Sequence, residues 1–218
     1  MSLDNPVWSS LSGAAAHLGT VHGRAARYDV DVTPFAAVED PADPDCWRDL
    51  GELLDGGVGV VIGVPAVPPG WEVSWTIAGV QMLGTGAVVL VDPDAVPLGA
   101  DDVPEMLALV ERTKPGPFLK RTVQTGGYVG IRDPGLVAMA GVRLRPTGWS
   151  EISAVCTDPA HQGRGLGRRV VSTVVAAVRD EGDEPMLHVM ADNAGAIRLY
   201  EAMGFEARRE IPFHLISQ

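Results

Sequence analysis

A glycine-rich stretch in the second half of the chain constrains its fold most. The stretch is Gln162, Gly163, Arg164, Gly165, Leu166 and Gly167. The apolar run at 152–157 is typical of a strand, and Asp158 with Pro159 forms a turn that ends it. Apolar residues then recur with helical spacing from Leu166 onward, and Gly182 is a typical stop signal. The pattern predicts a strand, a glycine-rich loop and a helix, in that order.

Such a loop is suited to binding an anion. Glycines let backbone N–H groups turn toward one point, and the first helical turn adds unpaired donors and its dipole. Arg164, Arg168 and Arg169 place cations at the same end, where they oppose the helix dipole unless an anion is bound. The alternative is an ordinary strand-to-helix turn whose glycines allow close packing. The stretch matches neither the dinucleotide fingerprint nor the P-loop ending.

A second motif follows after one helix and one strand. Residues 185–191 predict a strand, and Asp192 with Asn193 can cap a helix that stops at Gly204. Residues 193–205 resemble the second signature of the GNAT superfamily of acetyl-CoA-dependent N-acetyltransferases. Residues 162–167 resemble that family's first signature, Gln/Arg-x-x-Gly-x-Gly/Ala. The resemblance covers the chain from about residue 87 onward.

The resemblance implies a GNAT fold of the α/β (α+β) class, with a mixed, mostly antiparallel central sheet flanked by helices. We expect residues 1–84 to form an acidic, mixed α/β extension and residues 85–218 to form the acetyl-CoA-binding catalytic domain. The patterns also predict a helix over about 7–27 and a strand over 87–91. The extension could be a substrate lid, a dimer surface, or a partner lobe like that of glycine-N-acyltransferase-like relatives.

Charge is divided unevenly along the chain. Residues 1–105 carry 16 acidic and 3 basic side chains, and residues 106–218 carry 12 acidic and 14 basic ones, within a net charge of −11. The later part can therefore hold a polyanionic cofactor, whereas the earlier part would repel nucleic acid and anionic membranes. An acidic surface could also attract a cationic amine, but a solvated face that aids solubility is the favoured interpretation.

The remaining composition favours a cytoplasmic protein without a metal. No run of 18 apolar residues occurs, and the N-terminus lacks the basic and apolar segments of a secretory signal. Cys46 and Cys156 give neither a disulfide framework nor a metal-ligand spacing. We expect no nucleic-acid or membrane partner.

The resemblance also implies how acetyl-CoA would be held. The backbone of the strand before the loop would bind the pantetheine arm as an added strand, and the pyrophosphate would lie on N–H groups of the loop. The predicted cofactor-binding residues are Val155, Cys156, Thr157, Gln162, Gly163, Arg164, Gly165, Leu166, Gly167, Arg168, Asn193, Ala196 and Tyr200.

Amide formation from a thioester needs a neutral amine, a polarised carbonyl and a proton for the departing thiolate. Glu151 is the candidate general base, because on an unbroken strand it shares a face with Ser153 and Val155. It precedes Gln162 by 11 residues, a spacing similar to that of the base in the histone-acetylating branch of the family. The alternative is a solvated carboxylate at the strand end.

Tyr200 is the candidate general acid, because the family often places a tyrosine at this point of the second signature, near the CoA sulfur. Its phenol could protonate the thiolate, and a packing role is the alternative. We prefer direct attack in a ternary complex over an acyl-enzyme at Cys156, because a cysteine in mid-strand is more often a small buried hydrophobe.

The predicted function is therefore transfer of the acetyl group of acetyl-CoA to a primary amine of a small molecule, amino acid or protein. The alternative is a catalytically inactive CoA-binding module with a regulatory or interaction role. The resemblance implies that the early helices, around 115–127, and the loop between the last strands, around 210–214, select the acceptor. A homodimer is a further expectation.

Overall fold

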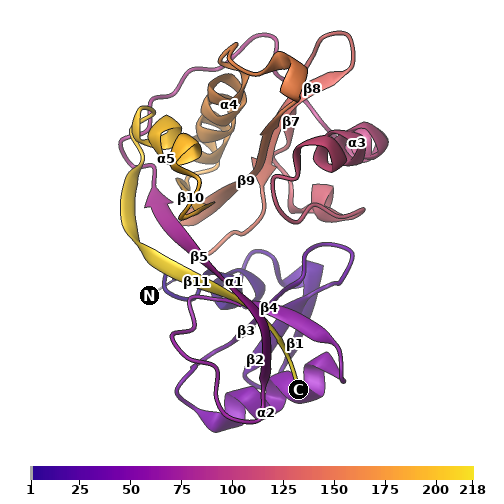
Figure 1. Ribbon diagram of the computed structural model, residues 1–218, viewed down its shortest axis with the longest axis vertical. Coiled ribbons are helices and arrows are strands. Elements are labelled where there is room, and N and C mark those ends of the chain that lie inside the picture. The colour runs from indigo at the N-terminus through magenta and orange to yellow at the C-terminus, as the bar shows by residue number, and fades with distance from the viewer. Residues whose placement is uncertain (1) are drawn as a thin grey trace.

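One continuous sheet joins the two halves of the molecule. The computed structural model describes residues 2–218. Within those residues the sheet has 11 strands in the order β1-β2-β3-β4-β11-β5-β10-β9-β8-β7-β6. Figure 1 shows the early half below, the later half above, and two long strands that run between them.

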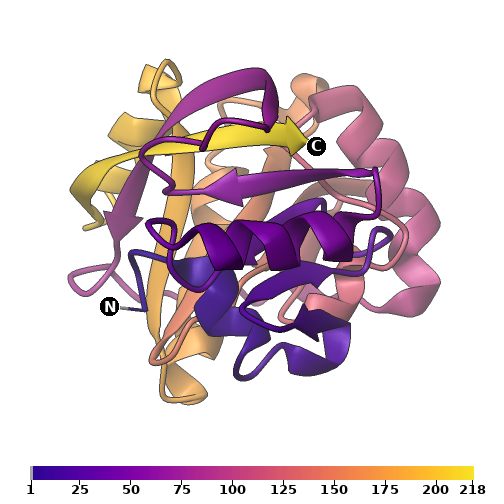
Figure 2. The ribbon, with the colours of Figure 1, turned by 90° about the horizontal axis from the view of Figure 1, so that it is seen from below.

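The early half is a small sheet covered on both faces. Its elements are α1 (Pro6–Leu11), β1 (Gly19–His22), β2 (Ala25–Tyr28), β3 (Phe35–Val38), α2 (Pro44–Leu54) and β4 (Val58–Ile62), with a 3-10 turn at Ala16–Leu18. α2 begins at Pro44, and the Asp43 side chain accepts a hydrogen bond from the Asp45 N–H. Buried residues of α1 and of α2 belong to two separate apolar clusters, one on each face. α2 lies across the strands in Figure 2.

Three of the expected elements are wrong. The loop expected around 210–214 lies inside the strand Glu206–Ser217. The predicted helix over about 7–27 ends at Leu11 and is followed by a hairpin of β1 and β2 that turns at Gly23, which has φ +55. Burial of Ala25 and Ala26 in the sheet overrides the helical preference of alanine. The predicted strand over 87–91 is absent; Ala87 is buried, residues 88–91 are exposed beside α4, and the Leu90 N–H donates to Ser172 Oγ.

The long strands β5 (Glu72–Leu83) and β11 (Glu206–Ser217) connect the halves. They pair antiparallel with each other, β5 also pairs with β10, and β11 also pairs with β4. The sheet is thus continuous across the division predicted near residue 84, which stays a prediction. Among residues 2–218 no helix is both long and apolar enough to cross a bilayer.

The later half holds the two sequence motifs. Its elements are β6 (Val96–Pro97), α3 (Val103–Thr113), β7 (Val129–Arg132), β8 (Leu136–Val142), β9 (Trp149–Thr157), α4 (Leu166–Asp180), β10 (Glu184–Met190) and α5 (Ala194–Glu201), with 3-10 turns at Ala100–Asp102, Thr122–Thr125 and Pro159–His161. α4 packs with α5 on one face of the sheet, and α3 packs on the other (Figure 1). The expected strand, loop, helix, strand and helix are therefore present in that order.

Candidate active site

The centre of the site is the point where two parallel strands separate. β9 pairs with β10 only as far as Ile152 with Leu187, after which β9 continues to Thr157 and β10 to Met190. Ala154 lies on β9 between Ile152 and Thr157 and has φ +52, and the register of β9 against β8 shifts at this position. Such a bulge bends the strand. It leaves backbone groups of β9 beyond Ile152 without a β10 partner.

The loop after β9 presents unoccupied backbone donors. Gly163 and Gly165 have φ +75 and +74, a conformation that residues with a Cβ rarely adopt. No atom lies within 4 Å of a Cβ built at either position, so the space above the loop is open. α4 begins at Leu166 without a side-chain cap, which leaves its first N–H groups free. These features fit a phosphate group.

The arginines near the loop are held by other groups. Arg164 Nη1 lies 3.1 Å from Asp133 Oδ2, and Arg168 Nη2 donates to the Ala202 carbonyl at 2.6 Å. Arg169 pairs with Asp92 and Asp94 on the segment that follows β5. Arg169 therefore does not supply the free cation that its place in the sequence suggests, because neighbouring carboxylates already bind it.

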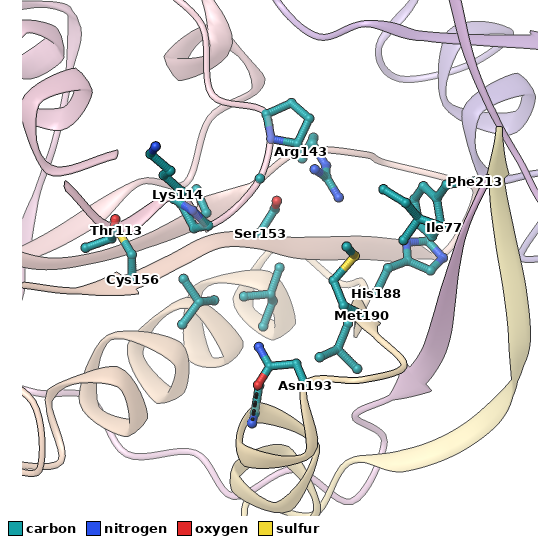
Figure 3. A pocket seen from close by; sticks show the side chains of 18 of the residues that line it. Ile77, Thr113, Lys114, Arg143, Ser153, Cys156, His188, Met190, Asn193 and Phe213 are labelled. Atoms are coloured by element: carbon teal, nitrogen blue, oxygen red, sulfur yellow. Dashed lines mark hydrogen bonds between the residues drawn. The ribbon is translucent and has the colours of Figure 1, made fainter. Parts of the chain in front are cut away.

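A cavity of about 730 Å³ lies between the separated strands. Of the predicted site residues, its lining includes Val155, Cys156, Thr157, Gln162, Asn193, Ala196 and Tyr200. Gly163, Arg164, Gly165, Leu166, Gly167 and Arg168 follow Gln162 outside the cavity wall. Figure 3 shows Ser153 and Cys156 of β9, His188 and Met190 of β10, and Asn193 before α5 around the same space. The two motifs thus meet at one site.

Glu151 lies beneath this cavity and does not line it. Its side chain is fully buried, and its two oxygens accept from Arg143 Nη2 at 2.7 Å and Nε at 3.1 Å. Burial alone would raise the pKa of Glu151, but the Arg143 charge and the hydrogen bonds from Arg143 and His188 outweigh it and lower the pKa to about 2. A carboxylate so placed is a weak base and cannot contact an acceptor. The sequence analysis did not predict this ion pair, because Arg143 comes from the end of the neighbouring strand.

His188 is fixed on both sides of its ring. Nδ1 lies 2.7 Å from Glu151 Oε1, and Nε2 lies 3.0 Å from Gln81 Nε2. The Gln81 amide also donates to the Leu3 carbonyl and accepts from Arg208, which orients it with Nε2 as the donor. His188 Nε2 must then accept, so the ring proton sits on Nδ1 and is donated to Glu151.

Two predicted side chains of the cavity are both neutral and protonated at pH 7. The Tyr200 hydroxyl has no hydrogen-bond partner among the described residues, and burial raises the pKa of Tyr200 to about 12. It is therefore a neutral phenol with a proton to donate. Burial also raises the pKa of Cys156 to about 11, which keeps its sulfur a protonated thiol and a poor nucleophile.

Arg143, His188 and Phe35 are among the cavity residues that were not predicted from the sequence. Arg143 and His188 interrupt apolar runs that form buried strands, and that interruption is the signal that could have identified them. Phe35 comes from β3 of the early half, and its ring centroid lies 4.7 Å from Arg143 Cζ. The early half therefore forms part of the cavity wall. No local pattern could show this, because the contact joins residues far apart in the sequence.

The strand β9 has a bulge and separates from its parallel neighbour β10 beside the uncapped, glycine-rich start of α4. This arrangement is typical of proteins that bind a phosphate-bearing ligand with an extended arm. The comparisons with known proteins identify the family. Residues 128–213 match the family model described as FR47-like protein. A crystal structure of a GNAT-family protein from Novosphingobium aromaticivorans is 40% identical, with a TM-score of 0.91 over 100% of this chain and 99% of that one. This chain belongs to the GNAT family, and the expected fold is confirmed.

Curated relatives match over shorter segments. The N-alpha-acetyltransferase RimI of Mycobacterium tuberculosis is 41% identical over 83 residues, which is 36% of this chain and 51% of that protein. The mycothiol acetyltransferase of Kocuria rhizophila is 47% identical over 57 residues, 26% of this chain and 19% of that protein. The matches thus span about half of the first relative and about a fifth of the second.

Proposed function

We propose that this protein transfers the acetyl group of acetyl-CoA to a primary amine by direct attack in a ternary complex. The observation that carries the proposal is the separation of β9 from β10 beside the open loop at Gly163 and Gly165. Relatives named as N-acetyltransferases add support. Acetyl-CoA, when bound, supplies an acetyl thioester that an amine can attack.

The chain's own residues would hold the cofactor along the separated strands. N–H groups from Gly163 through Arg168 would bind the pyrophosphate, and the free backbone around Val155 would bind the arm. Asn193 caps α5 through the bond that its Oδ1 accepts from the Ala196 N–H, which sets the wall beside the thioester end. The residues described contain no cluster of three or more side chains arranged for a metal ion.

The proton balance of the reaction assigns a role to Tyr200. The amine nitrogen bonds to the acetyl carbon as the carbon–sulfur bond breaks, the attacking amine loses a proton to water, and the thiolate gains one. Tyr200, neutral and unpartnered at the cavity wall, donates the proton to sulfur and regains one from solvent. Cationic Lys114 at the cavity lowers the pKa of a bound ammonium, which releases its proton to water.

Glu151 acts in this scheme as a positioning residue. It neutralises Arg143 and fixes the tautomer of His188 from below the cavity. We assign it no direct proton transfer from the amine, in contrast to the role that its spacing from Gln162 suggested.

Acetyl-CoA should raise the thermal unfolding midpoint of the purified protein, and a panel of primary amines should include one that releases free CoA thiol. Absence of acetyl-CoA binding to folded protein would contradict the proposal. Binding without thiol release from any amine or peptide would support the non-catalytic CoA-binding module instead.

A further inference from the structure

The charge of the cavity wall indicates the kind of acceptor. Among the described residues that line the cavity, three are cationic, Arg112, Lys114 and Arg143, and none is Asp or Glu. The chain as a whole has a net charge of −11. A site that selected a cationic or polyamine substrate would need carboxylates at its wall. No carboxylate lines the wall, and because Glu151 and Asp158 pair with Arg143 and Arg112, Lys114 is the unpaired cation among the described lining residues.

Arg143 has hydrogen-bonding capacity left over. Glu151 uses its Nε and Nη2 atoms, whereas Nη1 has no partner among the described residues. The Arg143 side chain is 8% exposed, and stacking on Phe35 fixes its plane. A buried guanidinium with unused donors calls for an acceptor group. In Figure 3 its nitrogens face the cavity.

Arg143 is far from the phosphate loop. It pairs with the Glu151 backbone at the start of β9, and the loop follows Thr157 at the other end of that strand. Six residues of strand span about 20 Å, so the pyrophosphate of the cofactor cannot reach Arg143. Arg112 is already paired with Asp158 at 2.8 Å. The free donors of Arg143 are therefore available to the acceptor.

The wall around Arg143 is apolar. Phe35, Ile77, Trp75 and Phe213 line the cavity, and the ring centroids of His188 and Phe213 lie 5.6 Å apart. We propose, given the acetyl-transfer function above, that the acceptor is a free α-amino acid with an apolar side chain. Its carboxylate binds Arg143 Nη1, its side chain packs on the aromatic wall, and Lys114 adds positive potential at the cavity.

The test compares acceptors that differ only in the carboxylate. Thiol release is measured with L-leucine, L-leucinamide and 3-methylbutylamine as acceptors. We expect kcat/KM for leucine to be at least roughly tenfold higher than for leucinamide or 3-methylbutylamine, which is the usual effect of a hydrogen bond to a charged group. Equal or better turnover of the amide or the amine would overturn the inference and leave acetyl transfer intact.

A binding measurement separates this inference from the proposed function. Calorimetry on CoA-loaded protein should detect binding of N-acetyl-L-leucine. The protein should bind N-acetyl-L-leucinamide at least roughly tenfold more weakly. This result stands even if no amine is turned over, in which case only the catalytic proposal fails. Equal affinity for the two compounds would refute carboxylate recognition.

Variants assign the effect to Arg143. Removing Arg143 alone would leave Glu151 buried and unpaired, so Arg143→Gln is combined with Glu151→Gln, which keeps an uncharged, hydrogen-bonded pair. The leucine KM should rise at least roughly tenfold while the acetyl-CoA KM is unchanged. If the variant still prefers leucine over leucinamide, Arg143 is not the residue that binds the carboxylate. If this double variant does not fold, Arg143→Lys, which keeps a charge opposite Glu151 but lacks the second guanidinium nitrogen, should still raise the leucine KM, whereas exposed Lys120→Gln, outside the cavity, should not.

Discussion

Tyr200 has a hydroxyl without a hydrogen-bond partner among the described residues. Tyr200→Phe removes that hydroxyl and keeps the ring, whose centroid lies 5.9 Å from that of Phe205. We expect kcat to fall by about 100-fold, typical of a lost general acid, with acetyl-CoA affinity little changed. Steady-state kinetics with a calorimetric titration would measure both. Full activity of the variant would show that thiolate protonation comes from elsewhere.

Glu151 should set the acid stability of the protein. Its pKa is about 2 in the folded state, below its ordinary value of 4.5. The ion pair with Arg143 therefore contributes stability above pH 4.5, and that contribution is lost as the pH falls from 4.5 toward 2. Glu151→Gln should lower the free energy of unfolding at pH 7 by about 3 kcal/mol and weaken this acid dependence.

The measurement is denaturant unfolding at several pH values. Glu111→Gln, on the exposed side of α3, is the matched control and should leave the curve unchanged. Parallel curves for Glu151→Gln and the natural chain below pH 4.5 would show that Glu151 is not the titrating group.

The loop before α4 separates two uses of glycine. Gly165 has φ +74, whereas Gly167 lies inside α4 with no positive φ and only ordinary contacts around a built Cβ. Gly165→Ala should lower the free energy of unfolding by about 1 kcal/mol and weaken acetyl-CoA binding. Gly167→Ala should leave stability unchanged or raise it by roughly 0.4–1 kcal/mol. Thermal melts of the two variants without cofactor test this, and equal effects would contradict the assignment of the left-handed turn to Gly165.

Elements with complete local signals were predicted well from the sequence. The order β9, loop, α4, β10 and α5 follows from periodicity, caps and glycines within one stretch. The failures came from tertiary contacts. Alanines at 25 and 26 are buried in a hairpin, and the apolar run at 87–91 lies exposed along α4. The site was predicted in the same uneven way, because Arg143, His188 and Phe35 meet Glu151 only after distant strands pair.

At the scale of the whole molecule, the division at residue 84 can be tested directly. Residues 85–218 lack β5, and without it β10 and β11 lose the strand that lies between them. We expect 85–218 to unfold without cooperativity and to aggregate through these edges, and 72–218, which keeps β5, to retain more structure. Circular dichroism melts would compare them. A cooperative melt of 85–218 with acetyl-CoA binding would establish it as an independent domain. The predicted homodimer stays a prediction.

The position of β11 has a consequence for how the protein forms on the ribosome. β11 lies between β4 and β5 in space, yet the chain makes it after every other strand of the sheet. During synthesis the β4 edge of the early half therefore has no β11 partner until residues 206–217 have emerged from the ribosome. Assembly depends on pairing across large sequence separations, which is slow. A nascent chain halted shortly before β11 should thus be a client for chaperones that shield exposed strand edges.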